Sequence, residues 1–132
     1  ATSSKGTALA SSDVYQCLSI PAESVILHAG MEVTEVLTGT SSDVGYDLGI
    51  TGGDVDNFVD GFDADGAAAG AYAPTSAAYA PVIVGAADTL DILVAAQTGT
   101  TLTGKIRVFA TLMDISDAGD MAANEVDRDT LA

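Results

Sequence analysis

The sequence has few basic, aromatic and sulfur-containing residues, and each shortage excludes a class of function. Four lysines and arginines stand against nineteen aspartates and glutamates, so the formal net charge is -15. A surface with this charge repels phosphate groups, and we therefore expect neither nucleic acid nor an anionic membrane as a partner. No apolar run approaches the ~20 residues of a membrane-spanning helix.

Residues that commonly carry chemistry are also scarce. The one cysteine, Cys17, lies between apolar residues, which excludes a disulfide within the chain and favours a small buried side chain over a nucleophile. The one histidine, His28, cannot form a zinc site of several histidines. Tryptophan is absent, so a sugar-binding cleft lined by aromatic rings is disfavoured. Because the G-x-S-x-G and phosphate-loop motifs are missing too, the sequence predicts a protein without enzymatic activity.

Apolar and polar residues alternate in short segments separated by Gly, Asp, Pro and Ser, a pattern typical of β-strands joined by turns. The expected strands cover residues 13–20, 23–30, 31–39, 43–51, 81–86, 88–96 and 104–116, with a short helical turn at 57–62. Short strands at nearly regular spacing predict an all-β fold, an antiparallel β-sandwich or jelly roll. We expect a single domain over residues 13–116, between flexible arms at residues 1–12 and 117–132.

Two of these segments make more specific predictions. In the segment 43–51, one face consists of Val44, Tyr46, Leu48 and Ile50. The other face is small or polar, which predicts a half-buried strand with one side in water. The segment 104–116 is apolar on both faces, which predicts either a central strand or a strand covered by a neighbouring subunit.

An acidic, glycine-rich segment follows residue 50 and has the residue types of a calcium site. Its carboxylates are Asp54, Asp56, Asp60, Asp63 and Asp65. Flexible loops that supply carboxylate oxygens bind calcium, but the spacing here departs from the EF-hand pattern. The alternative is a structural loop, in which Asp and Gly form the turns and Phe58, Val59 and Phe62 anchor the segment against the core.

The basic residues are few enough to be considered one by one. They are Lys5, Lys105, Arg107 and Arg128. Two lie on one face of the last expected strand and two lie in the expected arms. In so acidic a chain, this placement predicts contacts with acidic groups of a partner or of a sister subunit. Ordinary ion pairs within the chain are the alternative interpretation.

Three stretches resemble a family of small virion proteins of tailed bacteriophages of marine bacteria. They are VYQCLSIPAESVILHAGMEV, GYDLGITGGDVDNFVDGFDADGAAAGAYAP and DTLDILVAAQTGTTLTGKIRVFATLMDIS, all within residues 13–116, and the closing NEVDRDTLA is similar as well. The resemblance implies a head decoration (cement) protein, a small acidic β-sandwich that is often trimeric and binds outside the capsid shell. It implies no catalytic residue.

We therefore expect a non-enzymatic structural protein on the outer surface of the phage head, where it bridges major capsid proteins and forms a homo-oligomer, a trimer. The charge agrees with this location, because a chain this acidic would be repelled inside a shell filled with DNA. No cofactor is expected. The alternative is a receptor- or carbohydrate-binding module of a phage tail or fibre that depends on calcium at the five aspartates. A hydrolase that uses acids of the same cluster ranks third.

Overall fold

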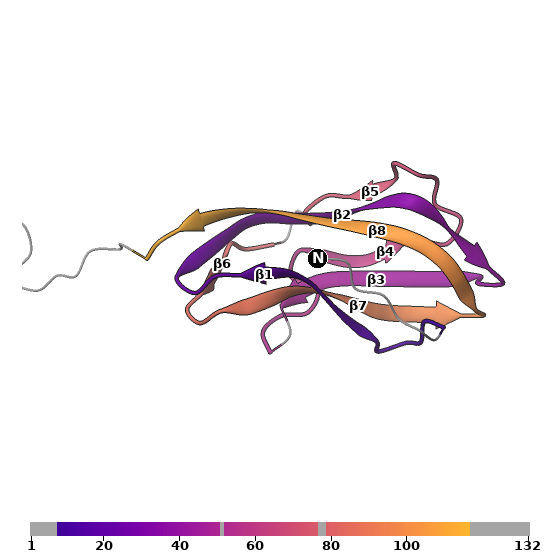
Figure 1. The fold of residues 1–132 in the computed structure, drawn as a ribbon, viewed down its shortest axis with the longest axis horizontal. Coiled ribbons are helices and arrows are strands. Elements are labelled where there is room, and N and C mark those ends of the chain that lie inside the picture. The colour runs from indigo at the N-terminus through magenta and orange to yellow at the C-terminus, as the bar shows by residue number, and fades with distance from the viewer. Residues whose placement is uncertain (1–7, 51, 77–78, 117–132) are drawn as a thin grey trace, which may run out of the picture.

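The computed structural model describes residues 8–50, 52–76 and 79–116, and its regular structure there consists of β-strands alone. The strands are β1 (Val14–Ile20), β2 (Ser24–Gly39), β3 (Asp43–Ile50), β4 (Val59–Asp63), β5 (Tyr72–Ala73), β6 (Val82–Val84), β7 (Asp88–Thr98) and β8 (Thr101–Asp114). Figure 1 shows β2 and β8 running together in one layer, above β3 and β7 in the other. Among the described residues there is no helix that could span a membrane.

Both layers are antiparallel sheets, and together they form the β-sandwich that the sequence predicts. The first sheet has the order β1-β7-β3-β4. In the second sheet, β8 pairs with β2 along almost its whole length, whereas β6 and β5 pair with two separate parts of β2. The β2 residues that pair with β6 also pair with β8, and so do the β2 residues that pair with β5. Therefore β8 must occupy one edge of β2, and the two short strands occupy the other.

The core lies between the two sheets and is formed by alternate residues of the long strands. On β3, the predicted face of Val44, Tyr46, Leu48 and Ile50 is confirmed, since every one of these side chains is buried. The opposing layer comes from β2, where Ile26, Ala29, Met31 and Val33 are fully buried. Close packing of branched apolar side chains between two sheets stabilises this class of fold.

The prediction of a wet side for β3 is wrong, because β3 is buried on both faces. Its outer face carries Gly45, Asp47 and Gly49, and the main chain of residues 54 and 55 lies directly against Gly49. The loop after β3 therefore folds back over the outer face of its own strand. A pattern of small and acidic residues is compatible with such a cover, because glycine leaves room for another backbone.

Asp47 has a structural role on that covered face. Two residues of β4, Asp60 and Gly61, lie opposite Asp47, so the ladder between β3 and β4 contains a bulge. Gly61 has a positive φ of 67°, and its N–H donates to Asp47 Oδ1 at 2.7 Å. The carboxylate thus satisfies the donor that the bulge leaves out of the ladder.

Two further predictions of local structure are wrong. The segments 23–30 and 31–39 form a single strand, β2, because Gly30 stays in the ladder opposite Phe109 and does not turn the chain. The expected helical turn at 57–62 is mostly strand, since β4 pairs with β3 there. In both places, pairing with a long neighbouring strand outweighs the local sequence signal.

The expected arms lie largely outside the described residues, which omit 1–7 and 117–132. Of the N-terminal arm, residues 8–12 are described and contact the sandwich. Ser12 N–H donates to the Val94 carbonyl at 2.8 Å, and Leu9 packs partly against the core.

Burial of Tyr46 predicts a loss of stability at alkaline pH. Burial raises the pKa of Tyr46 from 10.0 to about 12, and the nearby Tyr15 adds to the shift. Below pH 10 the hydroxyl is protonated in both the folded and the unfolded chain, so titration of Tyr46 takes nothing from the free energy of unfolding. Between pH 10 and 12 the unfolded chain loses this proton while the folded chain retains it, and the free energy of unfolding falls by about 2 kcal/mol.

Denaturant unfolding of the protein between pH 9 and pH 12 measures this loss. Tyr46→Phe should remove most of it, whereas Tyr72→Phe, at a tyrosine that is 64% exposed, should leave it in place. An equal loss in the Tyr46→Phe variant would contradict the assignment.

Candidate partner-binding face

The exposed apolar side chains gather on the second sheet. Nine large apolar side chains are exposed in the described residues, and seven of them belong to β2, β5, β6 and β8. The seven are Val36, Tyr72, Ile83, Leu102, Phe109, Leu112 and Met113. Exposed apolar residues that gather on one sheet mark an interaction site more often than scattered ones do.

Strand register places many of these side chains on the face of the second sheet that points away from the core. We call this surface the outer β2–β8 face, and its cross-strand partners are Val25 with Ile83 and Met113, His28 with Thr111, Gly30 with Phe109, Glu32 with Tyr72 and Arg107, Glu35 with Lys105, and Thr38 with Thr103. Side chains of directly paired residues point to the same side of a sheet, so the pairs form rows across it.

The apolar part of this face occupies the end near Val25. Ile83 is 70% and Met113 47% exposed, and between them they leave Val25 only 9% exposed. Phe109 crosses the sheet over Gly30, where an added Cβ would lie 2.7 Å from the ring and 2.6 Å from the Ala73 carbonyl oxygen. Glycine at this position therefore lets an aromatic ring lie flat across the sheet, with the ring still 44% exposed.

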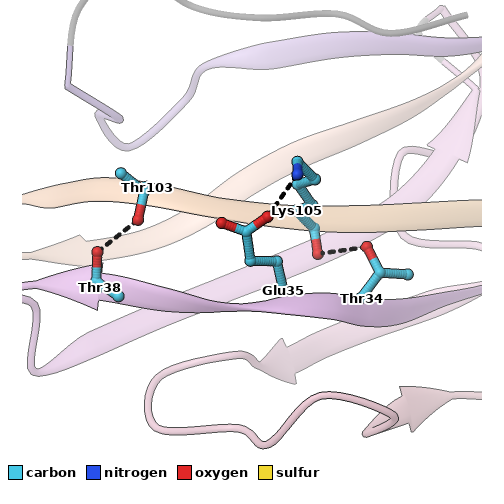
Figure 2. A network of polar contacts seen from close by, with 5 residues as sticks. All are labelled: Thr34, Glu35, Thr38, Thr103 and Lys105. Atoms are coloured by element: carbon cyan, nitrogen blue, oxygen red, sulfur yellow. Dashed lines mark hydrogen bonds and ion pairs between the residues drawn. The ribbon is translucent and has the colours of Figure 1, made fainter.

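The polar part of the face lies towards the other end of β2. Lys105 Nζ lies 2.5 Å from Glu35 Oε2, and Arg107 contacts Glu32 at 3.5 Å. Figure 2 shows how Lys105 connects the two strands, since Thr34 also donates to its carbonyl oxygen at 3.2 Å. Farther along, the hydroxyls of Thr38 and Thr103 lie 2.6 Å apart.

The two basic residues of this face have partners within the chain but remain accessible. The Lys105 side chain is 72% exposed and the Arg107 side chain 66%. Hydrogen bonding to Glu35, together with its charge, raises the pKa of Lys105, so this amine is fully charged at neutral pH. The ion pairs support the interpretation of contacts within the chain, and the exposure of both side chains is compatible with contacts to a partner. Lys5 and Arg128 lie outside the described residues.

The position of β8 excludes one of the two predictions made for it. Within the described residues β8 pairs with β2 alone, so it is an edge strand and not a central one. Its inward residues Ile106, Val108 and Ala110 are only partly buried against the core. The expectation of a strand covered by a neighbouring subunit is the one that remains.

The five aspartates of the possible calcium site are spread over the loop after β3, strand β4, which carries Asp60, and the turn after β4. Asp54 and Asp56 lie in the exposed loop over Gly49, whereas Asp63 Oδ1 accepts the N–H of Asp65 at 3.0 Å in the turn after β4. A hydrogen bond with Asp54, and the negative charge of that residue, raise the pKa of Asp56.

No group of three or more His, Cys, Asp or Glu side chains in the described part of the chain is placed to hold a metal ion. The calcium site therefore stays a prediction from the sequence. The expected anchoring of the loop is observed, because Phe58 and Val59 are buried and Phe62 packs partly against the core.

Cys17 and His28 occupy ordinary structural positions. Cys17 is half-buried, and this burial raises the pKa of its thiol, which favours the unreactive protonated form. His28 is exposed on β2, where its Nδ1 lies 3.1 Å from the Tyr79 hydroxyl.

Sequence reasoning found only part of this face. It placed Lys105 and Arg107 on one face of the last strand, as observed. It did not include Tyr72 or Ile83, which join the face through β5 and β6. Ile83 carried a signal in the sequence, because the middle residue of the short apolar run Val82–Val84 points to the opposite side of a strand from its two neighbours.

Comparisons with known proteins add no constraint to this geometry. No protein-family model, no curated protein and no solved structure matches the chain. The resemblance to phage virion proteins therefore stays an expectation from the sequence.

Proposed function

We propose that the protein is a non-enzymatic decoration (cement) protein of a tailed bacteriophage, bound to major capsid proteins on the outer surface of the head. The observation that carries the proposal is the composition of the outer β2–β8 face. Exposed apolar side chains and both described basic residues share one face of an otherwise acidic chain.

The shape and chemistry of this face suit a folded protein as the partner. A sheet presents Tyr72, Ile83, Phe109 and Met113 across several strands, and such a surface contacts a broad area rather than enclosing a small molecule. Lys105 and Arg107 adjoin the apolar part, where charges guide orientation and speed of association.

The overall charge supports an external location. With a net charge of -15, the chain would be repelled by packaged nucleic acid, whereas on the outside of a shell its charge keeps the particle soluble.

Replacing both basic residues tests the proposal. In Lys105→Ala/Arg107→Ala, Glu35 and Glu32 lose their partners and the face becomes locally acidic. We expect affinity for capsid shells of the encoding phage to fall about tenfold, as two partly exposed charge contacts are lost. Cosedimentation with shells that lack the protein measures this affinity.

A matched variant separates the face from total charge. Gln16→Glu/Thr98→Glu changes the net charge by the same amount at exposed positions of the first sheet and should bind normally.

Virions stripped of the protein should release their genome at a lower temperature than intact virions. Adding the protein back should restore the original release temperature. Equal release temperatures, or absence of the protein from purified virions, would refute the proposal.

A further inference from the structure

The edge of β8 is the longest unpaired strand edge in the described part of the molecule. β8 is 14 residues long and pairs only with β2 there, so the N–H and C=O groups of its other edge have no partner strand. Natural proteins rarely leave such an edge open, because it pairs readily with a strand of another chain. The other edge on this side of the sandwich, β1, has 7 residues and a bulge between Gln16 and Leu18.

The charge of the chain limits which surface of a second copy can approach this edge. Most approaches between two copies bring carboxylates together, since the chain has nineteen acidic and four basic residues. β8 differs, because Lys105 and Arg107 outnumber its single acid, Asp114. In an antiparallel pair of β8 strands, the basic half of each lies beside the half of the other that ends at Asp114.

We propose that β8 pairs antiparallel with β8 of a second copy of this chain, across a twofold axis at Phe109. This register pairs the strands from Gly104 to Asp114 and places Phe109 opposite its own symmetry mate. Arg107 then lies opposite Thr111 of the second copy, and Lys105 opposite Met113. Paired strands keep outward residues on one side, so the two outer β2–β8 faces join into one continuous sheet surface.

The same register keeps like charges apart. The two Arg107 side chains are four residues apart along the paired strands, about 14 Å, and the two Lys105 side chains about 27 Å. Both separations exceed the ~8 Å over which charges interact at physiological salt. Pairing also covers exposed apolar surface, because Phe109, Leu112 and Met113 are each at least 40% exposed on β8.

This dimer does not depend on the proposed capsid function. It differs from the trimer that the resemblance implies, because a closed threefold ring joins two different edges of each chain, whereas a twofold axis joins one edge to itself.

Sedimentation equilibrium of the full chain should show a dimer. Thr111→Lys places a positive charge opposite Arg107 of the second copy at two places in each dimer, and it should weaken the dimer about tenfold. Thr111→Glu places a negative charge there and should strengthen the dimer by a similar factor. Net charge alone would change the dimer affinity in the opposite directions. The lysine variant makes the chain less acidic, which reduces repulsion between copies, and the glutamate variant makes it more acidic, which increases that repulsion.

Thr98→Lys and Thr98→Glu carry the same charge changes at an exposed position outside β8. These controls should follow net charge alone. A monomer at all concentrations, a trimer, or Thr111 variants that behave like the Thr98 variants would each overturn the proposal.

A cross-link tests the register. In a Cys17→Ser background, which removes the only native cysteine, Phe109→Cys should oxidise to a disulfide-linked dimer. Opposite residues of an antiparallel pair lie within disulfide reach. Ile83→Cys, at an exposed position on the far edge of the sheet, should remain monomeric under the same conditions. Equal cross-linking of the two variants would contradict the register. Absence of a cross-link in Phe109→Cys, together with Thr111 variants that leave association unchanged, would contradict it as well.

Discussion

Replacing Gly49 by alanine should lower the free energy of unfolding by about 3 kcal/mol or more. Gly49 lies on the covered outer face of β3, and a Cβ there would overlap the carbonyl oxygen of Asp54 and the carbonyl carbon of Val55. Both obstacles are main-chain atoms, so a side-chain rotation cannot relieve them. The same Asp54 carbonyl accepts the N–H of Ile50 at 3.0 Å, and moving it away would break that hydrogen bond as well.

Urea denaturation measures the effect, and two other glycines provide a graded control. At Gly45, on the same face of β3, an added Cβ would lie 3.3 Å from the Ala96 Cβ, so a small loss is expected. At Gly53, within the covering loop, the nearest atom is the Ile50 carbonyl oxygen at 3.6 Å, which is an ordinary contact. Gly53→Ala should therefore be nearly neutral. A Gly49→Ala protein as stable as Gly53→Ala would mean that the loop does not cover β3.

Replacing Phe58 by alanine should cost about 3–5 kcal/mol. The Phe58 side chain is fully buried, and its ring centroid lies 6.1 Å from that of Tyr79. Its main chain connects two parts of the fold, because its N–H donates to the Leu48 carbonyl at 3.0 Å and its carbonyl accepts from Ser76 at 2.7 Å. Removing the ring leaves a cavity where the acidic loop meets the core.

Thermal and urea unfolding compare this variant with Val55→Ala. Val55 belongs to the same loop but is 39% exposed, so its truncation should cost well under 1 kcal/mol. Similar losses in the two variants would show that Phe58 does not anchor the loop.

Both predictions concern the acidic segment, and they assign it a structural role. Gly49 of β3 leaves room for the main chain of the segment, Asp47 of β3 accepts the N–H of Gly61 at the bulge, and Phe58 anchors the segment in the core. The remaining aspartates face solvent or make local turns, as Asp63 and Asp65 do. The surface proposed for binding lies on the other sheet, in the outer β2–β8 face.

Much of the fold followed from local patterns. Alternation identified β1, β3, β6, β7 and β8 and the buried face of β3, because side chains on a strand alternate between core and solvent wherever a sheet faces the core. Long-range pairing was less accessible. Continuous pairing with β8 joined two expected strands into β2, and pairing with β3 made β4 a strand where local residues suggested a helical turn.

The binding face shows the same division. The sequence alone determined that the chain is acidic, that it forms antiparallel strands with small residues in the turns, and that its last strand is apolar on both sides. These properties depend on neighbouring residues. Only the tertiary structure decided that β8 is an edge strand and that Tyr72 and Ile83 share a surface with Phe109 and Arg107. It also decided that the loop after β3 covers Gly49. The reason is physical: a strand's own residues determine which of its side chains alternate, but its edges and faces acquire neighbours only when segments distant in the chain pack together.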